Sequence, residues 1–247
     1  TDKGSLDGKK TYEFIYKNSK DKAYKNYFDW INRKNLKDHP YQLGLNSSPI
    51  YEKIFTPRRY EKLKILELGV ANGHSIASWH HFFPNSEVFG IDIKKPYKFF
   101  YTSKRVKYFE IDIFNKKKID QFIIQHGNFD YIIDDSMNSR KSMLLNFKNF
   151  FPSIKSGGAY FLEDTGFYDL VKNAFKEIKQ YNKKNNASYF LDSQTIVEIF
   201  TMLKNKNLKN DNILDEKFLS DIYLTINDVE FGRYDHPYAG MIIIHKK

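Results

Sequence analysis

KILELGVANGHSIASWHHFFPNSEVFGIDI, residues 64–93, predicts a strand, a glycine turn, a helix and a second strand. The short apolar run at 65–68 is typical of a strand buried on both faces of a parallel sheet. Gly69 and Gly73 let the backbone turn sharply and lie close to a ligand. The second strand, 88–92, ends in an acid. This order of parts predicts a βαβ unit with a ligand at its glycine turn.

The glycine turn carries an acid in front of it, in the pattern Glu67-x-Gly69-x-x-x-Gly73. Dinucleotide enzymes require G-x-G-x-x-G, because a pyrophosphate lies on the helix N-terminus. A carboxylate here would repel a pyrophosphate, but it suits a cofactor with a cationic amino-acid end. An acid that closes the second strand, Asp92, can bind both hydroxyls of a ribose. Together these residues resemble the first motif of the class I S-adenosylmethionine-dependent methyltransferases; an ordinary βαβ unit without a cofactor is the alternative.

The resemblance implies cofactor contacts along the whole carboxyl edge of the sheet. Asp112 closes a third predicted strand, where an acid often meets the adenine amino group; a helix N-cap is the alternative for this residue. The expected cofactor-binding residues are Lys3, Glu67, Gly69, Val70, Asn72, Gly73, Ser75, Asp92, Ile93, Asp112, Ile113 and Asp134.

Strands that alternate with helices predict an α/β fold, a doubly wound, seven-stranded, mostly parallel sheet of the Rossmann-like methyltransferase type. The predicted strands are 65–68, 88–92, 106–111, 128–133, 159–162, 218–229 and 239–245, the last two paired antiparallel. Predicted helices cover 11–17, 22–36, 50–55, 74–79, 116–125, 140–151 and 167–181. We expect an N-terminal helical extension over 1–60 and a methyltransferase domain over 61–247. A variable insertion is expected at about 183–217, where 190–215 is the least readable part.

Acidic residues fall at the carboxyl ends of most predicted strands. Clustered carboxylates repel one another unless a cation lies among them. Asp135 with Glu163 and Asp164 would supply hard oxygen ligands from two adjacent strands, which suits Mg²⁺, with Mn²⁺ or Ca²⁺ as alternatives. The competing interpretation is that Asp134 binds the cofactor or a helix N-terminus and that residues 163–164 form a capped loop.

The segments 132–135 and 150–164, IIDD and FFPSIKSGGAYFLED, resemble the metal-dependent sugar O-methyltransferases that act on macrolide deoxysugars. Related sequences are often described as cephalosporin-hydroxylase-like. Three further segments resemble the same family: TDKG at 1–4, SIASW at 75–79 and MIIIHK at 241–246. The resemblance is weak between 171 and 235, where such enzymes vary with their substrate.

This resemblance implies a Mg²⁺ held by Asp135, Glu163 and Asp164 that chelates vicinal hydroxyls of a sugar and lowers a hydroxyl pKa. One departure concerns the general base. The family has a His three residues after the second Asp, whereas this chain has Asn138, and an amide does not take a proton at neutral pH. The catalytic candidates are Asp134, Asp135, Asn138 and His236. Asp134 or His236 could be the base, or the metal could ionise the hydroxyl without one.

Composition narrows the partner classes. The chain has 247 residues, no cysteine and a formal net charge of +10. Lysines are spread along the whole chain rather than gathered in one stretch, so we expect no nucleic-acid partner, although a basic surface would suit a phosphorylated substrate. No apolar run approaches membrane-spanning length and the N-terminus does not resemble a signal peptide, which predicts a cytoplasmic protein. Relatives of this kind often form homo-oligomers through N-terminal helices.

We therefore expect a Mg²⁺-dependent S-adenosylmethionine:sugar O-methyltransferase. Sugar carriers in small bacterial pathways are usually nucleotides, so a nucleotide-activated sugar for a surface polysaccharide is the expected acceptor. A nucleic-acid methyltransferase is one alternative, although no Asn-Pro-Pro-Tyr-like motif follows the fourth strand. A catalytically silent cofactor-binding protein, motivated by Asn138, is another.

Overall fold

A computed structural model of the chain describes residues 48–71, 73–94, 103–137, 139–165, 196–209, 211–233 and 240–247. Its strands are β1 (Lys64–Leu68), β2 (Glu87–Asp92), β3 (Val106–Glu110), β4 (Phe129–Asp134), β5 (Ile154–Leu162), β6 (Ile226–Arg233) and β7 (Gly240–Lys246). They form one 7-stranded sheet in the order β3-β2-β1-β4-β5-β7-β6. The neighbours from β3 to β5 run parallel, and β7 is antiparallel to both β5 and β6. The expected doubly wound sheet is confirmed.

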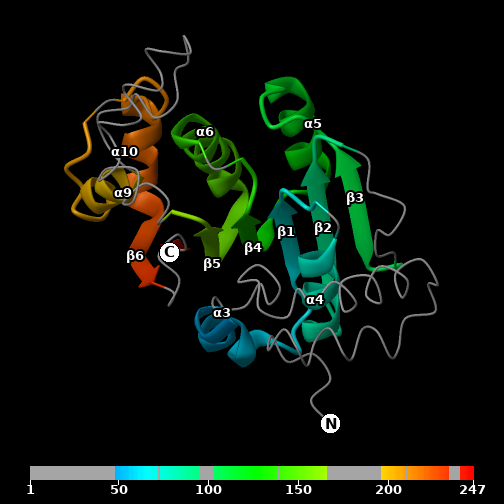
Figure 1. Ribbon diagram of the computed structural model, residues 1–247. Coiled ribbons are helices and arrows are strands. Elements are labelled where there is room, and N and C mark those ends of the chain that lie inside the picture. The colour runs from blue at the N-terminus through cyan, green and yellow to red at the C-terminus, as the bar shows by residue number, and fades with distance from the viewer. Residues whose placement is uncertain are drawn as a thin grey trace, which may run out of the picture.

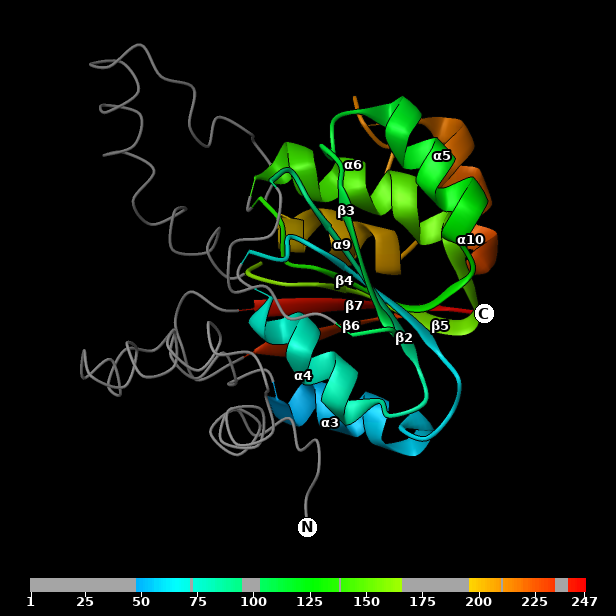
Figure 2. The same ribbon diagram turned by 90° about the vertical axis from the view of Figure 1, so that its right-hand side faces the viewer.

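Helices cover both faces of this sheet (Figure 1). They are α3 (Ser48–Phe55), α4 (His74–Phe82), α5 (Lys116–His126), α6 (Arg140–Phe150), α9 (Ile196–Lys204) and α10 (Glu216–Thr225), with short 3-10 helices η3 (Thr56–Arg58) and η4 (Phe151–Ser153). Figure 2 shows α3 and α4 on one face and α5, α6, α9 and α10 on the other. None of the described helices has the length and apolar character needed to cross a membrane.

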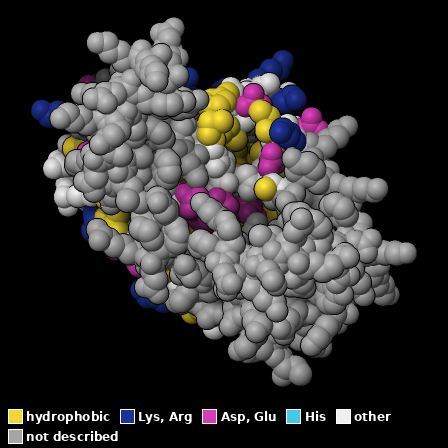
Figure 3. All heavy atoms as spheres, viewed as in Figure 1, with side chains coloured by type: hydrophobic (Ala, Val, Ile, Leu, Met, Phe, Trp, Pro, Cys, Tyr) yellow, Lys and Arg dark blue, Asp and Glu magenta, His cyan; other side chains and the backbone are white. Residues whose placement is uncertain are grey.

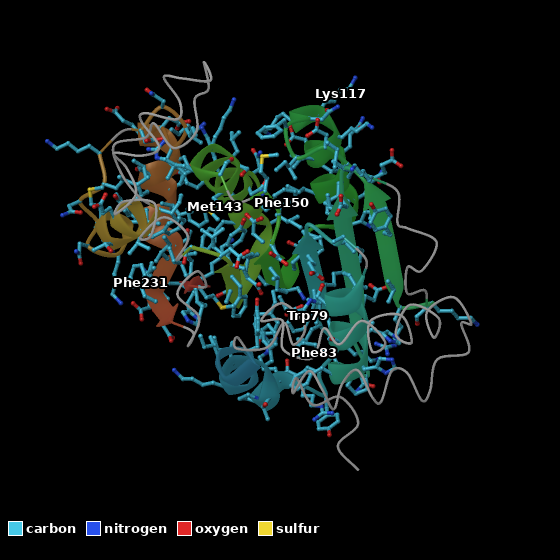
Figure 4. All side chains as sticks on the ribbon, viewed as in Figure 1. Trp79, Phe83, Lys117, Met143, Phe150 and Phe231 are labelled. Atoms are coloured by element: carbon cyan, nitrogen blue, oxygen red, sulfur yellow. The ribbon has the colours of Figure 1, made fainter. Side chains whose placement is uncertain are left out.

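Side chains that alternate along the strands fill two separate cores. The core under α3 and α4 contains Tyr51, Phe55, Ile65, Trp79, Tyr131, Ile133 and Phe161. The core under the other helices contains Leu66, Ile132, Phe147, Tyr160, Ile199 and Ile222. Trp79 and Phe83 lie on the α3 side, whereas Met143 and Phe150 lie on the opposite side (Figure 4). The alternation directs Glu67 and Glu163 toward α3 and α4, and Asp134 toward α6.

Helix starts are fixed by side chains that accept the first free backbone N–H groups. Asn115 accepts from the Lys118 N–H at the start of α5, and Ser139 forms a capping box with Ser142 at the start of α6. Asp215 accepts from the Phe218 N–H at the start of α10.

The predicted strand over 218–229 is wrong over residues 218–225. Residues 216–225 form α10, and β6 begins only at Ile226. The apolar residues Leu219 and Ile222 are three apart and both buried, which is the spacing of one helical face. The Asp215 cap also favours a helix over a strand at this point.

The remaining strands stand close to their predicted positions, with one shifted start. β5 begins at Ile154 rather than Ala159, because the ladder between β4 and β5 is interrupted by a register shift. Gly157, with a φ of 74°, lies in the interruption. The helix α9 lies within 190–215, the segment for which no secondary structure was predicted. The predicted helices at 11–17, 22–36 and 167–181 lie outside the described residues.

Candidate active site

Acidic side chains gather where three neighbouring strands end. Glu67 lies on β1, Asp134 and Asp135 close β4, and Glu163 and Asp164 follow β5. β4 pairs in parallel with both β1 and β5, so these ends meet at one edge of the sheet. Figure 3 shows acidic side chains gathered at the centre of one face of the molecule. In open parallel sheets this edge is where ligands bind.

The glycine turn lies directly against the loop that follows β4. Gly69 has a φ of 84°, and a Cβ placed on it would come within 2.2 Å of the Asp135 carbonyl oxygen. The Asp135 N–H donates to the Leu68 carbonyl at 2.9 Å. The predicted cofactor turn and the first predicted metal ligand therefore share one backbone junction, which only glycine allows.

Asp92 holds the other side of this turn. Its Oδ2 accepts from the N–H groups of Val70 and Ala71, both at 2.9 Å. Oδ1 accepts a longer bond of 3.3 Å from the Lys94 N–H. Ala71 has a positive φ of 44°, a conformation that costs energy in a non-glycine residue. Asp92 thus stabilises a strained loop and keeps one lightly engaged oxygen.

Glu67 is buried, with 1% of its surface exposed. It accepts hydrogen bonds from the Ser75 hydroxyl and, at 3.1 Å, from Trp79 Nε1. Burial, assisted by the charges of Glu163 and Asp92, raises the pKa of Glu67 to about 8 despite these two bonds. A cationic group nearby would favour the ionised form.

Asp134 is enclosed by donors on the α6 side of the sheet. Its carboxylate accepts from the Ser136 hydroxyl at 2.7 Å, from Asn146 Nδ2 at 3.1 Å and from the Tyr160 hydroxyl at 2.7 Å. Burial raises the pKa of Asp134. These contacts make Asp134 an anchor for the loop that carries Asp135, and they occupy the oxygens that a general base would use.

The three predicted metal ligands influence one another electrostatically. The pKa of Asp135 is raised well above its ordinary value. The first cause is desolvation of its carboxyl group, and the second is the charges of Glu163, Asp164 and Glu67. Burial and the charge of Asp164 raise the pKa of Glu163 to about 7. Asp164 has a positive φ of 55°, which is uncommon outside strained or functional positions.

Within the described residues, no group of three or more His, Cys, Asp or Glu side chains is close enough to form a ready-made metal cluster. The donor chemistry nevertheless fits a hard cation, since carboxylate oxygens are the ligands that Mg²⁺ prefers. The described Lys and Arg residues form no ion pair with Glu67, Asp134, Asp135 or Glu163. Four carboxylates that no described Lys or Arg residue neutralises favour cationic ligands.

The other predicted site residues either lie away from the acidic group or fall outside the residues that the structure describes. Asp112 Oδ1 accepts from the Phe114 N–H at 2.9 Å in a turn before α5, whose N-cap is Asn115. Ile93 is exposed and Ile113 is half-buried next to these turns. The residues that lie outside the described part of the chain are Lys3, Asn72, Asn138 and His236.

Several polar groups of the site were not singled out from the sequence. Tyr51 donates to Glu163, and Asn146 and Tyr160 donate to Asp134. A partial signal existed for Tyr160, because it stands two residues before Leu162 and so shares the face of β5 that looks toward α6. Tyr51 gave no comparable signal, since its partner is 112 residues away.

Comparison with known proteins gives the same architecture. The solved structure of MycE methyltransferase from the mycinamycin biosynthetic pathway, in complex with Mg, SAH and mycinamycin VI, superimposes with a TM-score of 0.58 at 20% identity, over 81% of this chain and 49% of that one. This chain has the class I methyltransferase fold. No protein-family model matches it.

In sequence, this methyltransferase-fold chain resembles macrolide-sugar O-methyltransferases. It is 28% identical over 124 residues to mycinamicin VI 2''-O-methyltransferase of Micromonospora griseorubida, and 30% identical over 122 residues to L-olivosyl-oleandolide 3-O-methyltransferase of Streptomyces antibioticus. Each match covers 47% of this chain and 31% of the relative. The chain therefore matches less than a third of the length of these relatives.

Proposed function

We propose that the chain is a Mg²⁺-dependent S-adenosylmethionine:sugar O-methyltransferase. The observation that carries the proposal is the group of carboxylates at the carboxyl edge, of which Glu67, Asp134, Asp135 and Glu163 form no ion pair with the described Lys and Arg residues. A cofactor with a sulfonium and an ammonium group, together with a divalent metal, would supply the missing positive charge. The sequence relatives are all named O-methyltransferases, which supports the reaction class.

Each residue of the chain then has a role that its contacts support. Glu67 would attract the ammonium group of the methionine end, and Asp92 would accept from the ribose while it holds the glycine turn. Asp135, Glu163 and Asp164 would hold the metal. When bound, S-adenosylmethionine supplies the methyl group and Mg²⁺ lowers the pKa of the acceptor hydroxyl. Positioning by these groups would account for much of the rate.

The general base follows from the same proposal. Asn138 replaces the expected His and cannot accept the proton at neutral pH. Asp134 is engaged by Ser136, Asn146 and Tyr160. His236, the other candidate base, lies outside the described residues. We infer that metal-assisted ionisation of the acceptor carries most of the activation, so removal of Mg²⁺ should lower the rate far more than a few-fold.

For the acceptor, we favour a nucleotide-activated sugar destined for a bacterial surface polysaccharide. The relatives are named for mycinamicin VI and L-olivosyl-oleandolide and not for a nucleotide-activated sugar, so this step goes beyond them. The formal net charge of +10 suits a diphosphate carrier. A screen of nucleotide sugars, with mass spectrometry to detect one added methyl group, would identify the acceptor.

Thermal melting with S-adenosylhomocysteine, with and without Mg²⁺, tests the proposal. A ligand that binds only the native state raises Tm by mass action. We expect the cofactor product to raise Tm and Mg²⁺ to raise it further, and Asp135→Ala to abolish only the second shift. Asp120→Ala is the matched control, because Asp120 is an exposed acid on α5 that pairs with Lys116.

The outcomes separate the alternatives. A shift with the cofactor product but none with Mg²⁺ would count against metal dependence and favour a nucleic-acid methyltransferase or a silent binding protein. Absence of both shifts would contradict the cofactor site itself.

A further inference from the structure

Tyr51 connects α3 to the carboxylate edge of the sheet. Its side chain is buried, with 2% of the residue exposed. Its hydroxyl donates a hydrogen bond to Glu163 Oε1. Among the described residues none donates to the other oxygen, Oε2, so Tyr51 holds one oxygen of this carboxylate and does not occupy the other.

The ring of Tyr51 is fixed by aromatic neighbours from three elements. Its centroid lies 5.1 Å from Phe55 on α3, 5.0 Å from Trp79 on α4 and 5.2 Å from Phe161 on β5. A ring enclosed in this way has little freedom to move, so its hydroxyl can hold Glu163 in one orientation.

The helix that carries Tyr51 is itself seated on the edge strand of the sheet. A Cβ on Gly232 of β6 would come within 2.4 Å of Ile50 Cδ1, so the Ile50 side chain of α3 packs directly against this glycine. Lys53 on the same helix lies 3.5 Å from Glu230 of β6.

Tyr51 and Trp79 form a matched pair of donors. Trp79 donates to Glu67, the acid of the glycine turn, while Tyr51 donates to Glu163. Both acids point to the same face of the sheet, and the two rings meet edge to face at an interplanar angle of 65°. Each acid of the proposed cofactor and metal sites is therefore oriented by its own aromatic donor.

We propose that Tyr51 is a positioning residue for the metal site. It holds Glu163 Oε1 so that the carboxylate is preorganised for a divalent cation, and it acts on the metal through Glu163 without touching the metal or the substrate. The inference rests on the proposed function. It assigns to α3, which precedes the first strand, a part in metal binding.

The test is the affinity of the protein for Mn²⁺ alone, measured by electron paramagnetic resonance in the presence of saturating S-adenosylhomocysteine. Tyr51→Phe keeps the ring and removes only the donor. Loss of a group that orients a metal ligand typically costs about 10-fold to 100-fold in metal affinity. We expect the Mn²⁺ Kd of Tyr51→Phe to rise by about 10-fold or more, with the Kd for S-adenosylhomocysteine unchanged.

Tyr223→Phe is the matched control. Tyr223 also donates through its hydroxyl, at 2.9 Å to the Leu208 carbonyl, on the opposite face of the sheet. This variant should change neither Kd. A double-mutant cycle with Glu163→Gln adds a readout that a purely structural role would not give: in the Glu163→Gln background, Tyr51→Phe should cause no further loss of Mn²⁺ affinity.

Equal Mn²⁺ affinity in the wild type and Tyr51→Phe would overturn the inference and leave the proposed function intact. Failure of the wild type to bind Mn²⁺ would overturn both. A lower Tm in Tyr51→Phe with unchanged Mn²⁺ affinity would reduce Tyr51 to a structural role.

Discussion

Gly69 is the residue at which the fold and the proposed chemistry are hardest to separate. Alanine at this position would need a φ of 84° and would place its Cβ 2.2 Å from the Asp135 carbonyl oxygen, which is backbone and cannot easily move aside. We expect Gly69→Ala to lower the free energy of unfolding by about 3 kcal/mol or more. Displacement of the 135–136 loop should also abolish the Tm shift with S-adenosylhomocysteine. Urea denaturation and thermal melting check the two parts.

Gly157→Ala is the control for backbone strain alone. Gly157 has a similar φ of 74°, but nothing lies within 4 Å of the added Cβ. This variant should lose only about 1 to 2 kcal/mol and keep its response to the cofactor product. An equal loss in both glycine variants would show that contact with the Asp135 loop is unimportant.

Glu67 should make the ligand-free protein less stable as the pH rises. Its pKa in the folded chain is about 8, whereas its ordinary value is 4.5. Between these values the folded state keeps a proton that the unfolded state has released, so the free energy of unfolding falls by up to about 1.4 kcal/mol per pH unit. The contribution of Glu67 is complete below pH 4.5 and is lost as the pH passes 8.

Glu67→Gln removes this titration and keeps the shape of the side chain. Urea denaturation between pH 5 and 8 should therefore give a shallower decline for Glu67→Gln than for the wild type. Glu87→Gln, a change at a half-exposed acid on the neighbouring strand, should leave the decline unchanged. Parallel declines for the wild type and Glu67→Gln would contradict the raised pKa.

At the scale of single elements, α4 depends on an arginine from the start of β3. Arg105 donates to the carbonyls of Phe83 at 2.9 Å, Ser86 at 2.7 Å and His80 at 3.1 Å, which lie at or just beyond the C-terminal end of the helix. A cation at this end also complements the helix dipole. Arg105→Ala should lower the free energy of unfolding by about 2 to 3 kcal/mol, because it removes charge-assisted bonds to buried carbonyls. Urea denaturation measures the loss.

Lys107→Ala, two residues further along β3, is the comparison. Lys107 pairs with Glu87 at 2.6 Å, but both side chains are about two-fifths exposed, at 39% and 42%. A pair in that setting contributes less than about 1 kcal/mol. A similar loss of unfolding free energy in the two variants would mean that the Arg105 contacts stabilise the protein no more than an exposed ion pair does.

Most elements could be predicted because their signals are local. The apolar runs of β1, β2 and β4 and the glycine turn after β1 stand in continuous sequence, so their order already implies the parallel sheet. Residues 218–225 were misread because Phe218, Leu219 and Ile222 satisfy a loose apolar pattern in either state. Asp215, the N-cap that favours a helix here, lies just before that stretch.

The site could be predicted only where it follows from strand ends. Glu67, Asp135 and Glu163 stand at the ends of predicted strands, and parallel pairing brings them to one edge. The donors that orient them come from helices on either face, and their contacts depend on tertiary packing. Trp79 was predicted only as part of the helix at 74–79, although its indole N–H also donates to Glu67 at 3.1 Å.

At the scale of the whole molecule, the two faces of the sheet are stabilised differently. The face under α3 and α4 carries the aromatic donors of the site. The other face is covered in part by α9 and α10, which lie within the segment 171–235, where the relatives are expected to vary. Arg140 at the start of α6 forms an ion pair with Asp211 at 2.5 Å, and only 13% of each side chain is exposed. This pair ties the region between α9 and α10 to the helix that follows the Asp135 loop.

Asp211→Ala should therefore loosen one layer and leave the rest of the sheet intact. Removal of one partner from a poorly solvated pair typically costs about 3 kcal/mol. We expect faster amide hydrogen exchange in 196–209 and 211–225, with exchange in β1 and β4 unchanged, because local opening follows the least stable unit. Asp228→Ala is the control, since its pair with Lys204 at 3.1 Å is 43% and 48% exposed. Faster exchange throughout the sheet would instead mean that the two faces unfold as one cooperative unit, so that changes in the 196–225 layer would be felt at the carboxylate edge.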